Sequence, residues 1–61
     1  IMKIDNYKEL ANDFRKVADT LDQIQKVLDD KSLSFEEKDK KTDDLLGKYL
    51  IQMLKINSKI K

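Results

Sequence analysis

The sequence predicts an all-α fold: a two-helix antiparallel hairpin that self-associates into a four-helix bundle dimer. Apolar residues in the first half of the chain follow a heptad pattern, which gathers them on one side of a helix. The 61 residues include no proline and a single glycine, so little interrupts long helices. Polar, turn-forming residues divide the chain near its middle. Residues 1–61 are therefore expected to form a single helical-hairpin domain.

The first helix is expected to span about residues 6–30. Asn6 is a helix-capping residue, and Glu9 follows it at the third helical position. The apolar residues that alternate at steps of three and four form one stripe: Tyr7, Leu10, Phe14, Val17, Leu21, Ile24 and Leu28. A strand would send alternate members of this stripe to opposite faces, so a period of two is excluded. The stripe needs a second helix to cover it.

The second helix is expected to span about residues 35–60, after a break at residues 29–34. Ser34 and Glu37 form a capping box at its start. Acidic residues crowd its beginning and lysines its end, as the helix dipole favours. Its apolar stripe is broader than that of the first helix and contains Leu45, Leu46, Tyr49, Leu50, Ile51, Met53, Leu54, Ile56 and Ile60.

The two stripes are not expected to cover each other completely. A fold at residues 31–33 places Phe14 opposite Leu50, but it places Leu21 opposite Asp43. A chain of this length seldom builds a sufficient core alone, and without cysteine it has no disulfide to stabilise it. We therefore expect a homodimer whose interface contains Leu21, Ile24, Leu28, Leu45 and Leu50.

The composition argues against catalysis and against a metal or cofactor site. Histidine and cysteine are both missing, which removes the commonest general acid–base group and the thiolate and imidazole ligands. The acidic residues occur as adjacent pairs such as Glu36 and Glu37, whose side chains diverge on a helix. We expect no catalytic residue, no metal and no cofactor, and hence a protein that is not an enzyme.

The charge distribution favours another protein as the partner. Thirteen basic and twelve acidic residues nearly cancel, so no global field attracts nucleic acid. From Leu45 to the end, by contrast, the chain has lysines and no acidic residue. A mixed apolar and basic patch on the second helix is the candidate site for a protein partner: Lys48, Ile51, Leu54 and Lys55.

Two alternatives remain open at this point. A dimer of such hairpins resembles, in architecture, the plasmid-encoded RNA-modulating protein Rop. That resemblance implies an RNA- or DNA-binding role, in which Lys38, Lys40 and Lys41 would contact phosphates between acidic neighbours. The basic amphipathic stretch from Leu45 to Lys61 is also typical of an element that lies on a membrane surface.

Several segments resemble short uncharacterised helical proteins of phages and prophages of Gram-positive bacteria. The segments are residues 6–11, 14–19 and 46–55, and the resemblance covers most of the chain; it implies an origin but no activity. The absence of cysteine, of a long apolar run and of a secretion signal favours a cytoplasmic location. Ile1 before Met2 is interpreted as a remnant of cloning or processing.

Overall fold

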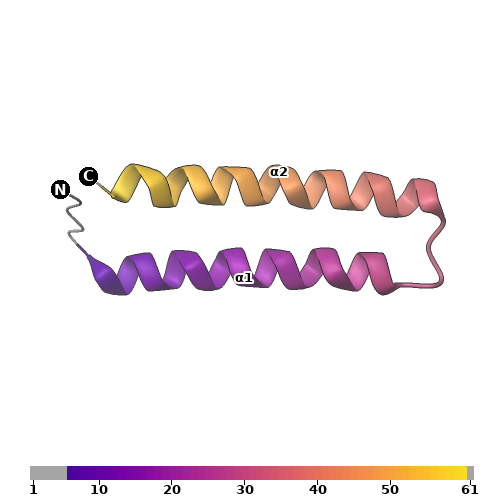
Figure 1. The fold of residues 1–61 in the computed structure, drawn as a ribbon, viewed down its shortest axis with the longest axis horizontal. Helices are drawn as coiled ribbons and strands as arrows, with labels where there is room; N and C mark the ends of the chain where they lie inside the picture. The colour runs from indigo at the N-terminus through magenta and orange to yellow at the C-terminus, as the bar shows by residue number, and fades with distance from the viewer. Residues whose placement is uncertain (1–5, 61) are drawn as a thin grey trace.

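The structure is an antiparallel hairpin of two helices (Figure 1). It is a computed structural model that describes residues 6–60, so the interpretation of Ile1 lies outside the described residues. Helix α1 spans Tyr7–Asp29 and helix α2 spans Phe35–Lys59. The hairpin is 46 Å long and 16 × 13 Å across. The predicted all-α hairpin is confirmed.

The helix ends lie where the capping residues predict them. The Asn6 side chain accepts a hydrogen bond from the Glu9 N–H at 3.0 Å. At the start of α2, the Ser34 hydroxyl and the Glu37 carboxylate each accept a hydrogen bond from the other residue's backbone N–H, both at 3.2 Å. The hydrogen bonds from the Ser34 backbone N–H and then its side chain lower the pKa of Glu37. Because these bonds join residues three positions apart, they form as soon as the first turn does.

The core of the hairpin is small and lies between the two helices. Leu10, Val17 and Ile56 are buried, and Ile56 is only 2% exposed. Half-buried Tyr49 and Met53 pack against this cluster, as does Ile60.

The apolar stripe of α1 divides into two rows. Leu10 and Val17 are buried against α2, whereas Tyr7 and Phe14 of the other row remain exposed. A single neighbouring helix covers only the row that points at it. The expectation that a single hairpin leaves part of this stripe uncovered is therefore confirmed, and the uncovered part is a row along the whole of α1 as well as the end near the loop.

The register of the two helices differs from the expected one. The Thr20 hydroxyl donates to Gln52 Oε1 at 2.9 Å, whereas a fold at residues 31–33 places Leu21 opposite Asp43. The loop does not turn back at once, and α2 begins beyond the last turn of α1 (Figure 1). Leu21 therefore lies level with the part of α2 near Gln52, which is later in the sequence and more apolar than the stretch around Asp43.

Gly47 lies within α2, and its replacement by alanine is expected to stabilise the protein. A Cβ at this position would meet nothing within 4 Å among the described residues, and the glycine has no positive φ. Alanine should therefore raise the free energy of unfolding by about 0.4–1 kcal/mol, which urea denaturation can measure. A destabilised Gly47→Ala variant would mean that another helix approaches α2 closely at this point.

Candidate interaction surface

One side of the hairpin carries large exposed apolar side chains from both helices. We call this surface the apolar face and define it by Tyr7, Phe14, Leu21 and Leu28 of α1 with Leu46, Leu50 and Leu54 of α2. These side chains are 42–72% exposed. The four residues of α1 are seven positions apart, which keeps them on one line along the helix. Large exposed apolar side chains gathered on one side make this face a candidate binding surface.

A groove runs along the apolar face between the helices. It has a volume of about 510 Å³ and is lined by Phe14 of α1 and by Leu50, Met53 and Leu54 of α2, among others. Buried Ile56 also lines it, which joins the groove to the core. Its lining is mostly apolar, so a hydrophobic side chain from a partner is the occupant that it favours.

The residues predicted to form the dimer interface fall into two groups. Leu21, Leu28 and Leu50 are exposed on the apolar face, where a second copy can reach them. Ile24 and Leu45 are half-buried. Ile24 follows Val17 by seven residues, so it belongs to the row that faces α2. The structure therefore brings Leu21, Leu28 and Leu50 onto the apolar face and leaves Ile24 and Leu45 off it.

The predicted partner patch lies on the outer side of α2, and all four of its residues are exposed: Lys48, Ile51, Leu54 and Lys55. Ile51 is 60% exposed and Leu54 67%. They differ in their surroundings, however. Leu54 lines the apolar groove, whereas Ile51 and the two lysines line a second groove on the opposite side of the hairpin. The patch therefore extends over the back of α2 from one groove to the other.

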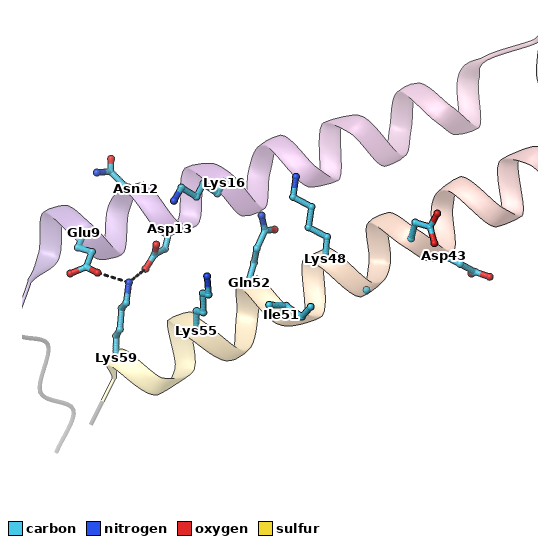
Figure 2. Close-up of a pocket in the computed structure, with 12 residues that line it drawn as sticks. Glu9, Asn12, Asp13, Lys16, Asp43, Lys48, Ile51, Gln52, Lys55 and Lys59 are labelled. Atoms are coloured by element: carbon cyan, nitrogen blue, oxygen red, sulfur yellow. Dashed lines mark hydrogen bonds and ion pairs between the residues drawn. The ribbon is translucent and has the colours of Figure 1, made fainter.

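The second groove is polar and has a volume of about 900 Å³ (Figure 2). It is lined by four acidic and four basic side chains, among others: Glu9, Asp13, Asp43 and Asp44, with Lys16, Lys48, Lys55 and Lys59. No group of three potential metal-ligating residues converges within residues 6–60. What the groove offers is a balanced set of charges on the side away from the apolar face.

Lys59 joins the two helices across the polar groove (Figure 2). Its Nζ lies 2.5 Å from Asp13 Oδ2 and 2.8 Å from Glu9 Oε1. The hydrogen bond to Asp13 and then that to Glu9 raise the pKa of Lys59. Sequence reasoning interpreted Lys59 only as a lysine that suits the end of a helix. The ion pairs could have been predicted from the antiparallel hairpin, because it brings the last turn of α2 beside the acidic first turns of α1.

Thr20 and Gln52 form a polar pair inside the helix–helix interface that sequence reasoning also missed. Thr20 is 1% exposed, and its hydroxyl shares one proton between Gln52 Oε1 at 2.9 Å and Lys16 O at 3.1 Å. Thr20 follows Val17 by three residues, so its position in the heptad could have placed it in the interface. A hydrogen-bonded pair in an apolar interface disfavours a slipped register, because slipping would leave both groups buried and unpaired.

The Lys59 ion pairs give a testable dependence on pH. The raised pKa of Lys59 means that these pairs stabilise the folded state below the unfolded-state pKa of lysine, about 10.4. That contribution is lost as the pH rises through the folded-state pKa. The NMR titration midpoint of Lys59 should therefore fall when Asp13 is replaced by asparagine, which keeps the shape and removes the charge. Equal midpoints in the parent and in Asp13→Asn would contradict this assignment.

Neither helix is apolar over a length that could cross a bilayer, within the part of the chain that the structure describes. Comparisons with protein-family models, with curated proteins and with solved structures found no match to the chain.

Proposed function

We propose that the protein is a non-enzymatic homodimer that acts by binding another protein. The observation that carries this proposal is the apolar face, which is unpartnered in the single hairpin. Its seven side chains expose on the order of 700 Å², close to the roughly 800 Å² per partner of a stable protein interface. Within residues 6–60, by contrast, the core has only three buried apolar residues, so a second copy would supply the burial that one hairpin lacks.

The non-enzymatic part of the proposal is supported by what the polar groove contains. Its best-organised group is Lys59 with Asp13 and Glu9, in which both carboxylates are ion-paired with the lysine. A general base needs a carboxylate or amine free to take a proton from a substrate. This arrangement suits a structural link between α1 and α2.

Sedimentation equilibrium at micromolar concentration tests the dimer. The chain mass is 7.2 kDa, and we expect a folded particle of twice that mass. Circular dichroism on the same samples verifies that the particle is helical. A folded particle with the mass of a single chain would overturn the homodimer.

In a dimer formed through the apolar face, the back of α2 remains free, and we propose it as the site for the protein partner. Lys48 and Lys55 flank exposed Ile51 there, and α2 has no acidic residue after Asp44. An acidic amphipathic segment is the complement of that surface.

The partner site is tested by capture of proteins from the cytoplasm of a Gram-positive host. That source follows from the proposed cytoplasmic location and from the proposed phage or prophage origin. Ile51→Glu places a charge in the patch away from the apolar groove, so the dimer should persist while capture is lost. Gln23→Glu adds the same charge on exposed α1 and is the matched control, which should retain capture. Equal capture by Ile51→Glu and Gln23→Glu would exclude the back of α2 as the docking site.

Nucleic acid is the second candidate partner, and the same preparations test it. Lys38, one of the three lysines concerned, donates its ammonium proton to the Leu28 carbonyl at 3.0 Å, which occupies it within the hairpin. A gel shift that weakens steeply with salt would favour the nucleic-acid role over the protein partner. Flotation with anionic liposomes would favour the membrane-surface role.

A further inference from the structure

The polar groove contains three lysines whose charges are not matched by ion pairs. Lys16 lies on its α1 wall, and Lys48 and Lys55 lie on its α2 wall. Among residues 6–60, Lys59 is ion-paired with two carboxylates, whereas these three lysines form no ion pair. All three side chains are exposed. The middle of the groove therefore presents three positive charges to an anionic ligand.

The hydrogen bond between Thr20 and Gln52 places these lysines relative to one another. Lys16 precedes Thr20 by one turn of α1, and Lys55 follows Gln52 by about one turn of α2. Because the helices are antiparallel, both steps lead toward the open end of the hairpin, so Lys16 and Lys55 lie at about the same level on opposite walls. Lys48 lies one turn from Gln52 in the other direction and extends toward α1, as Lys55 does (Figure 2). The three lysines thus form one basic stretch of the groove.

Carboxylates lie at both ends of this basic stretch. Asp43 and Asp44 line the groove on the loop side of Lys48, and Glu9 and Asp13 line it at the open end. A nucleic-acid strand has a negative charge at every phosphate, so it would meet these carboxylates wherever it left the basic stretch. A protein segment can have acidic side chains in the middle of the groove and uncharged or basic ones beyond it. The order of charges therefore favours a protein over a nucleic acid.

The two lysines of α2 have a spacing that a second helix can match. Lys48 and Lys55 are seven residues apart, which is about 10.5 Å along α2. Acidic residues seven positions apart on another helix have the same separation, so a helix that lies along the groove can pair with both lysines at once. Exposed Ile51 lies between the two lysines and also lines the groove. An apolar residue between the two acids of the partner would contact it.

From these observations we infer that the polar groove binds an acidic amphipathic helix of the protein partner. One of its carboxylates pairs with Lys48, and another lies between Lys16 and Lys55, which attaches the partner to both helices of the hairpin. The inference rests on the proposed partner site and extends it, because that site includes α2 alone. The partner helix is expected to have two acidic residues seven positions apart with an apolar residue between them.

A synthetic helical peptide with this pattern tests the inference. It contains two glutamates seven positions apart and a leucine between them, and the reference peptide has glutamine in place of both glutamates. Fluorescence anisotropy of labelled peptides measures their affinity for the full-length protein. We expect the glutamate peptide to bind about tenfold more tightly at low ionic strength, because two ion pairs distinguish the peptides. Equal affinities, or no binding of either peptide, would overturn the inference.

Variants of α2 locate the peptide on the protein. The double variant Lys48→Gln with Lys55→Gln should lose the preference for the glutamate peptide. Lys40→Gln with Lys41→Gln removes the same two charges from exposed positions of α2 outside the groove, so it should keep that preference. Equal losses in the two double variants would mean a general attraction between charges and would overturn the groove as the site. A single-stranded oligonucleotide that binds more tightly than the glutamate peptide, and only with Lys48 and Lys55 present, would assign the groove to nucleic acid instead.

Lys16→Gln separates this inference from the proposed function on which it rests. It should weaken binding of the glutamate peptide by about threefold, whereas Lys26→Gln, the matched change on exposed α1 outside the groove, should not. If Lys16→Gln and Lys26→Gln bind equally and only the α2 lysines matter, the partner is confined to the back of α2. The inference would then be wrong while the proposed partner site stands. Failure of that site itself appears as retained capture by Ile51→Glu.

Discussion

Replacing Leu21 with alanine is expected to weaken the dimer by on the order of 2–5 kcal/mol. Leu21 is 48% exposed in the single hairpin, so much of its surface is available for burial by a second copy. Each dimer contains two copies of the substitution, so both copies contribute to the loss. The dissociation constant from sedimentation equilibrium measures this effect directly.

Asp22→Ala is the matched control for Leu21→Ala. Asp22 is the next residue on α1 and is exposed, so its replacement should change stability by no more than about 0.5 kcal/mol. A dimer constant that is the same in the parent and in Leu21→Ala would mean that the apolar face is not the dimer interface. The melting temperature is a second readout, because folding is linked to dimerisation. It should depend more steeply on protein concentration in Leu21→Ala than in the parent.

Ile56→Ala is expected to lower the free energy of unfolding by about 2–5 kcal/mol, because it leaves a cavity in the core. Ile56 is 2% exposed and is one of three buried apolar residues in the part of the chain that the structure describes. A loss of this size is a large fraction of the total stability of a small domain. The variant should therefore be largely unfolded by circular dichroism under conditions in which the parent is helical.

Ile51→Ala is the matched control in the same helix. It makes the same chemical change at a side chain that is 60% exposed, so its unfolding curve in urea should lie within about 0.5 kcal/mol of the parent's. Similar losses for Ile51→Ala and Ile56→Ala would mean that α2 does not turn Ile56 toward α1, and that the core is formed differently.

The helices and their ends follow from the sequence because they depend on neighbours a few residues apart. Asn6 caps α1 and Ser34 caps α2 through bonds to the residue three positions later. The heptad spacing of the apolar residues determined which side of α1 is apolar. It also identified Leu21, Leu28 and Leu50 as side chains without sufficient cover. The same spacing placed Ile51 and Leu54 off the stripe that faces α1, and both side chains are exposed.

The tertiary structure alone decided which of the apolar residues face inward. Leu10 and Phe14 are only four positions apart in the heptad, and the helix period gives no reason to bury one and expose the other. Packing on a single partner helix makes that choice, because α2 covers one row and leaves the next one open.

The register of the two helices was also decided by the tertiary structure. The path of the loop carries the start of α2 past the end of α1 (Figure 1), and so Thr20 meets Gln52 and Asp13 meets Lys59. These pairs join residues far apart in the chain, and their positions depend on the distance that the loop travels before α2 begins.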